Sequence, residues 1–114
     1  MIRSTRPRLE DIDQNITIAL AFVYQRTLNH VTHDFALRYA LQYALLIISE
    51  AVKHLPADLC AEHPEIPWRK IKSLGDKLLH EDQRVDPEIV WDVATVHLKP
   101  LHVAIKQMLK QTAW

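Results

Sequence analysis

Apolar residues recur every three or four positions along most of this chain, which is the spacing of helices with one buried face. The first such stripe lies in residues 9–28, so we predict a helix there. Residues 30–34 interrupt the pattern, and either Thr32 or Asp34 is available as the N-cap of the next helix. The apolar positions of the first stripe are Leu9, Ile12, Ile16, Ala19, Leu20 and Val23.

The segment 33–54 predicts the most apolar helix of the chain. Its polar residues form only a narrow stripe, so the helix needs cover on nearly all sides. Two arrangements provide that cover. Part of this helix or its neighbour packs across a dimer interface, or a compact five-helix bundle covers it alone. We predict the dimer. The polar stripe consists of Asp34, Arg38, Gln42, Ser49 and Lys53.

Prolines mark the remaining elements. Pro56 opens a short helical turn over 56–61, and Pro67 suits the first turn of a helix that leads to His80. Asp86-Pro87 predicts the start of another helix, and Pro100 predicts a kink or short break near residues 97–99. The expected fold class is all-α, an up-and-down bundle of about five helices that forms one domain over residues 1–114.

Composition limits the possible functions. The formal net charge is zero, so any contact with nucleic acid must come from a local patch. The lone Cys60 excludes an internal disulfide and fits a reducing cytoplasm. The N-terminus has no apolar signal region, and the longest apolar run, residues 39–48, is too short to span a membrane. We therefore predict a cytoplasmic protein with no membrane span. No pair of the seven histidines has the spacing and partners of a zinc site, and no Gly-rich phosphate loop is present. We therefore expect no metal and no cofactor.

Several short motifs then occur in a characteristic order. In order and spacing they resemble the I-G-E-A…L-P, P-W-x-x-I…H…V-D…I-V-W and L-x-P-L segments of HepT-like proteins, a branch of the HEPN superfamily. The resemblance covers nearly the whole chain, from Leu9 to Leu109. The matching residues are I-S-E-A at 48–51, H-L-P at 54–56, P-W-R-K-I at 67–71, His80, V-D at 85–86, I-V-W at 89–91 and L-K-P-L at 98–101.

The resemblance implies a small all-helical homodimer, often encoded beside a minimal nucleotidyltransferase as a toxin–antitoxin pair. In that family the HepT-like partner is the toxin, typically a metal-independent endoribonuclease with the motif R-N-x-x-x-H-x-Y. The two motifs of a dimer face one another across a cleft. In some pairs the nucleotidyltransferase silences the toxin by adenylylating the tyrosine of the motif.

This chain departs from that motif. In register, the histidine is kept as His80, whereas the arginine falls on Gly75, the asparagine on Asp76 and the tyrosine on Asp82. A glycine cannot hold a phosphate, and an aspartate lacks the hydroxyl that accepts the adenylyl group. Gly75 lies within a helix, where it costs about 1 kcal/mol relative to alanine, and it predicts close packing against a neighbouring helix.

The candidate site residues follow from the chemistry of RNA cleavage through the 2′-hydroxyl. His80 suits proton transfer near neutral pH. Asp76 lies four residues before it on the same helix face, close enough for a hydrogen-bonded pair that favours the protonated imidazole. The alternative for His80 is a helix C-terminal histidine favoured by the helix dipole. Glu50 also lies on the narrow polar stripe of the helix over 33–54, and it either lies near the cleft or faces solvent.

An arginine suits stabilisation of the charged phosphorane. Another cation must take this role here. Arg84 is the favoured substitute because it lies just past the acidic turn of Glu81 and Asp82; Arg69, Lys72 and Lys77 are the other candidates. Two functions remain open. One is a HepT-like toxin whose ribonuclease activity is weakened or lost. The other is a non-catalytic partner of a minimal nucleotidyltransferase, which binds a nucleotide or substrate.

Overall fold

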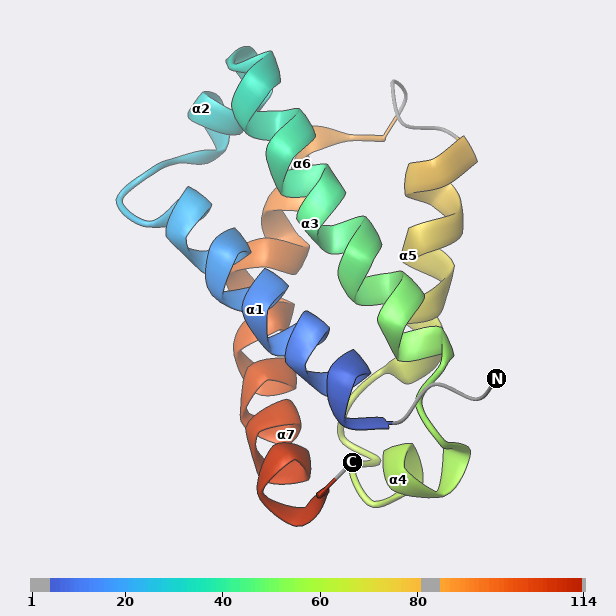
Figure 1. The fold of residues 1–114 in the computed structure, drawn as a ribbon. Helices are drawn as coiled ribbons and strands as arrows, with labels where there is room; N and C mark the ends of the chain where they lie inside the picture. Colours follow the sequence, from blue (N-terminus) through green and yellow to red (C-terminus); the bar gives the residue numbers. More distant parts are fainter. Residues whose placement is uncertain (1–4, 81–84, 114) are drawn as a thin grey trace.

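The structure is a computed structural model that describes residues 5–80 and 85–113. The described residues are helical, with no strand, so the all-α prediction is confirmed (Figure 1). The helices α6, η1 and α7 follow one another without a gap. In chain order the elements are α1 (Thr5–Val23), α2 (Leu28–His33), α3 (Phe35–Lys53), α4 (Ala57–Ala61), α5 (Trp68–His80), α6 (Pro87–Asp92), the π-helical turn η1 (Val93–His97) and α7 (Leu98–Gln111).

Helix α3 lies at the centre of the bundle. It packs against α1 on one side and α5 on the other, and α1 also packs on α7 (Figure 1). Full burial of each large apolar side chain in this core contributes about 1.5–3 kcal/mol. The stripe predicted for the first helix forms part of this core. The largest fully buried apolar side chains of the whole core are Leu9, Ile12, Ile16, Val31, Leu41, Leu45, Val52, Val90, Leu101, Ile105 and Met108.

The structure corrects the prediction around residues 23–34. Helix α1 ends at Val23 rather than at residue 28, and Gln25 adopts a positive φ of 55°, which a right-handed helix does not allow. The expected break instead contains α2. Thr27 is its N-cap, and the Thr27 backbone N–H donates to His30 Nδ1 at 3.0 Å. A histidine in this capping role gives a weak sequence signal, because Gln or Glu normally occupies that position.

Two other local predictions are confirmed in kind. Asp34 caps α3, because its side chain accepts a hydrogen bond from the backbone N–H of Leu37 at 3.0 Å. The irregularity expected from Pro100 is present, but it lies upstream as the π-helical turn η1, where the Leu98 N–H donates to the Val93 carbonyl. Pro100 has no N–H, and its ring would clash with the carbonyl four residues earlier. The wider turn includes that earlier residue, Val96, and relieves the clash.

One face of α3 stays uncovered in this chain. Phe35, Tyr39 and Tyr43 are spaced four residues apart and are 61%, 48% and 65% exposed. The bundle therefore does not cover the central helix alone. By length and composition α3 would also suit a membrane span, but half of that stretch is buried inside the bundle, as for the core helix of a globular protein.

Candidate functional site

Helix α5 carries the motif and is fixed at both its start and its middle. Its first residue, Trp68, donates its indole N–H to the carbonyl oxygens of Cys60 and His63, each at 3.0 Å. Further along, Gly75 and Leu78 are buried against α3. Because α5 is held at Trp68 and again at Gly75 and Leu78, the bundle sets the direction of α5 and the position of its last residue, His80.

Gly75 lies where α5 packs directly against Ser49 of α3. A Cβ placed on Gly75 would lie 2.7 Å from the Cβ of Ser49, which is far inside van der Waals contact. Ser49 is fully buried, and its hydroxyl has no hydrogen-bond partner among the described residues. The close packing predicted for Gly75 is therefore confirmed. A side chain at the position that the motif fills with arginine would require Ser49 and α3 to shift.

The carboxylate of Asp76 binds a lysine from the neighbouring helix. Lys53 Nζ lies 2.7 Å from Asp76 Oδ1 and 3.0 Å from Glu50 Oε1. The hydrogen bond from Lys53 is the main cause that lowers the pKa of Asp76, and the bonds to Asp76 and Glu50 raise the pKa of Lys53. One cation between two carboxylates leaves this cluster with a formal charge of −1.

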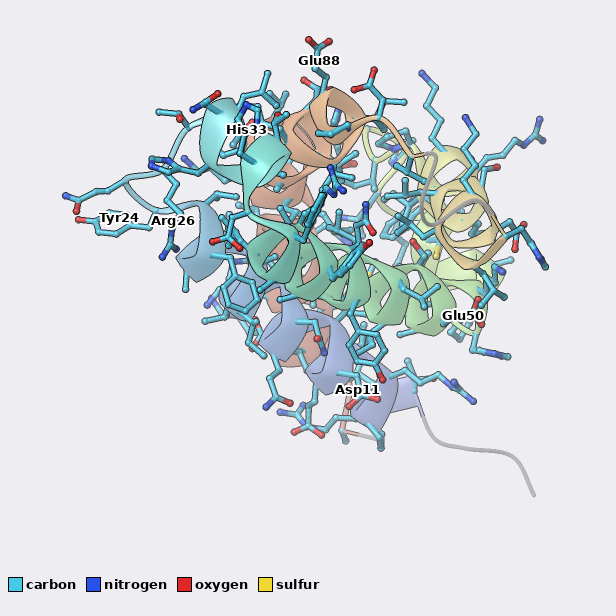
Figure 2. All side chains as sticks on the ribbon, turned by 90° about the horizontal axis from the view of Figure 1, so that it is seen from above. Asp11, Tyr24, Arg26, His33, Glu50 and Glu88 are labelled. Carbon is cyan, nitrogen blue, oxygen red and sulfur yellow. The ribbon has the colours of Figure 1, made fainter. Side chains whose placement is uncertain are left out.

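Lys53 joins two of the predicted site residues, Glu50 and Asp76, although the sequence did not indicate Lys53 as a site residue. Glu50 lies near the end of α3, close to α5, and its side chain is about half exposed (Figure 2). Lys53 is separated from Asp76 by 23 residues. Its only signal in the sequence was its position three residues after Glu50 on the narrow polar stripe of α3.

His80 is exposed at the C-terminal end of α5. Among the described residues no hydrogen bond joins it to Asp76, because that carboxylate is directed to Lys53. The charge of His80 acts on Asp76 only as a smaller contribution that lowers the pKa of Asp76. The expected hydrogen-bonded pair is thus replaced by a pair between helices.

The remaining predicted cations occupy different places. Arg69 and Lys77, together with Lys70, line a groove between α5 and the α6–η1 segment. Lys72 is half-buried on the same helix. Arg84, with Glu81 and Asp82, lies outside the described residues.

The histidines and cysteine elsewhere in the chain make other contacts. His102 Nε2 lies 2.7 Å from Asp13 Oδ1, and His97 Nε2 lies 3.2 Å from Asp92 Oδ2. Cys60 is buried, and this burial raises the pKa of its thiol. In the part of the chain that the structure describes, no three histidine, cysteine or acidic residues gather as a metal site.

The fold and the motif helix together describe a small helical protein with one exposed histidine beside a charged cluster. Over residues 12–108 the chain matches the family described as ribonuclease HepT-like, and it belongs to that family. It is 33% identical to a probable ribonuclease HepT of Thermococcus cleftensis, over 96% of this chain and 100% of the relative. It is 31% identical to a candidate RNase of Caldanaerobacter subterraneus subsp. tengcongensis, over 96% and 98% of the two chains.

A third relative is a candidate RNase of Methanocaldococcus jannaschii, 33% identical over 80% of this chain and 75% of the relative. No solved structure matches the chain. The family resemblance read from the sequence is therefore confirmed.

Proposed function

We propose that this chain is the HepT-like toxin of a cytoplasmic toxin–antitoxin pair and cleaves RNA slowly, as a homodimer and without a metal ion. The observation that carries the proposal is the contrast between His80 and Gly75 on one helix. His80 remains exposed at the end of α5, whereas the arginine position is closed by Ser49. The proton-transfer group is kept and the motif's own cation is lost.

His80 supplies the chemistry that a metal-free cleavage needs. The imidazole accepts the proton of a ribose 2′-hydroxyl, and the resulting oxygen attacks the adjacent phosphorus. The bond from phosphorus to the 5′-oxygen breaks, and that oxygen takes up the proton that the His80 imidazolium holds. The products are a 2′,3′-cyclic phosphate and a free 5′-hydroxyl. A well-placed acid–base group contributes about 10²–10⁴ in rate.

The closed arginine position explains why the rate is low. A charged donor aimed at a developing oxyanion is worth about 10²–10³ in rate. Lys53 is the nearest described cation to Asp76, but it is already bound by two carboxylates. The cluster's negative charge also opposes the approach of a phosphate.

The uncovered face of α3 supports the homodimer. Beside the exposed aromatic stripe lies a shallow groove of about 250 Å³ that reaches α5 through Leu78 and Leu79. Leu79 is 58% exposed and directly precedes His80. Gln42 lines the same groove, and its buried Nε2 has no hydrogen-bond partner among the described residues. A second copy seated here buries the stripe and brings the two His80 side chains toward one another.

The second candidate is a non-catalytic partner of a minimal nucleotidyltransferase. It is favoured by the same cluster of Glu50, Lys53 and Asp76, since a site with net negative charge suits protein contact better than RNA cleavage. With aspartate at position 82, adenylylation of the motif tyrosine cannot regulate the chain. Either function leaves the dimer in place.

Analysis of RNA ends distinguishes the two functions. The purified protein is incubated in EDTA with single-stranded RNA and with transfer RNA, and the products are examined by mass spectrometry. We expect 2′,3′-cyclic phosphate ends from the wild type and none from His80→Ala. His33→Ala is the matched control, because His33 is also an exposed histidine at a helix end (Figure 2). The absence of cleavage by every protein would favour the binding partner.

A further inference from the structure

A second groove, larger than the one beside α3, lies between α5 and the α6–η1 segment. Its volume is about 450 Å³. On one side of it α5 packs on α3, and on the other the α6–η1 segment packs mainly on α1, α2 and α7. The apolar side chains that line it are Ile71, Leu74, Ile89 and Val93, and its cations are Arg69, Lys70 and Lys77.

The three cations of this groove have no carboxylate partner among the described residues. The ion pairs that the structure describes leave Arg69, Lys70 and Lys77 aside, unlike Lys53. His97 also lines the groove, but it is paired with Asp92 and is not counted as an anion ligand. In a chain with no net charge, this groove is a local basic patch of the kind that contact with nucleic acid requires.

The position of the cations connects the groove to the candidate site. Lys70 and Lys77 lie two turns apart on one face of α5, which corresponds to about 10 Å along the helix axis. His80 follows Lys77 by three residues, about 5 Å further along the axis. The opposite wall includes the π-helical turn, an irregularity that is frequent at functional sites.

We propose that this groove binds single-stranded RNA next to the point of cleavage. Phosphates of one strand contact Lys70, Lys77 and Arg69, and one unstacked base rests on the apolar floor. The volume lies within the range of small-ligand pockets, so it suits a nucleotide rather than a duplex. The proposal rests on the proposed function, because the strand is directed toward His80. An aliphatic floor offers no pattern of donors and acceptors, so binding has little base preference.

The test measures binding separately from cleavage. Fluorescence anisotropy of a labelled single-stranded RNA is recorded with the His80→Ala protein, which leaves the RNA intact. The additional pair Lys70→Ala and Lys77→Ala should weaken binding at least tenfold. Two lost phosphate contacts should also reduce the slope of log K against log salt by about 1.4. The matched control is Lys106→Ala with Lys110→Ala, two exposed lysines of α7 outside the groove. The control should bind like its parent.

The outcomes distinguish failure of the proposed RNA groove from failure of the proposed ribonuclease function. Equal binding by the groove variant and the control would overturn the groove, even where the wild type cleaves RNA. Binding that is lost only in the groove variant supports the groove, even where the wild type cleaves nothing and the proposed ribonuclease fails. An absence of RNA binding in the parent protein would also overturn the groove. Far-UV circular dichroism and thermal unfolding confirm that each variant folds.

Discussion

Gly75 of the motif helix α5 packs directly against Ser49 of the central helix α3. A Cβ at position 75 would lie 2.7 Å from the Cβ of Ser49, so the two helices approach one another only because position 75 is glycine. The same contact closes the position that carries arginine in the R-N-x-x-x-H-x-Y motif. This contact therefore affects both the packing of α5 on α3 and the side chain that position 75 can carry.

Gly75→Ala should destabilise the protein, although alanine is the better helix former by about 1 kcal/mol. The added methyl must push Ser49 and α3 apart, and such overpacking costs about 1–3 kcal/mol. Urea unfolding followed by circular dichroism measures the change. Ser73→Ala, at an exposed position of the same helix, is the control and should have little effect. A Gly75→Ala protein more stable than the wild type would show that the contact is not tight.

Ser49→Gly should rescue Gly75→Ala, because it removes the Cβ that the new methyl meets. The double-mutant cycle is then strongly non-additive, as expected for two residues in direct contact. Ser49→Ala keeps the Cβ and should rescue nothing. Additive effects of Ser49→Gly and Gly75→Ala would contradict the contact.

The pair of Lys53 and Asp76 predicts a pH dependence. The pKa of Asp76 is lowered below its ordinary 3.8, so the pair stabilises the fold above that pH. This contribution is lost as the pH falls through the lowered pKa. The pKa of Lys53 is raised above its ordinary 10.5, so the contribution persists below that pH and is lost as the pH rises through the raised pKa.

NMR titration of the Asp76 carboxyl group tests this relationship. In Lys53→Met the pKa of Asp76 should rise toward its ordinary value, because the main cause of the shift is removed. Glu50→Gln is the matched control, since it leaves the bond between Lys53 and Asp76 in place. A pKa of Asp76 that is equally low in Lys53→Met would rule out this pair as the cause.

The dimer proposal predicts that a charge on the α3 face separates the copies. Sedimentation equilibrium should show a wild-type dimer and a Tyr43→Glu monomer, because the introduced carboxylate would be buried without a partner. Tyr24→Glu is the control, since Tyr24 is 71% exposed and extends outward from the bundle just past the end of α1 (Figure 2). A wild-type monomer at concentrations of tens of micromolar would contradict the proposal.

The sequence predicted features that depend on local spacing. Helical spacing of apolar residues predicts the buried stripe from Leu9 to Ala19. A polar residue just before a helix predicts an N-cap, which Asp34 forms. A glycine within a helix predicts close packing, which Gly75 shows. No pattern predicts helix α2, because His30 occupies the cap position where Gln or Glu is usual. The irregular turn begins earlier than the sequence predicts, because the π-helical turn lies upstream of Pro100.

The candidate site could be predicted only in part. The motif and the polar stripe point to His80, Asp76 and Glu50 as candidates, but they do not point to Lys53 as the partner of Asp76. Lys53 lies on another helix, and its contact with Asp76 depends on how closely α3 and α5 approach at Gly75. The glycine predicts close packing against a neighbouring helix, but no pattern along the chain identifies that neighbour as α3.

We propose that His80 acts without an arginine because Ser49 closes position 75. The most direct test is the single-turnover rate of RNA cleavage in EDTA for a variant that opens and refills this position. The variant combines Ser49→Gly, Gly75→Arg and Asp76→Asn, and Ser49→Gly alone is the control. We expect the combined variant to cleave about 10²–10³ faster, the value of a restored charged donor. A folded combined variant that cleaves no faster than the control would contradict the account.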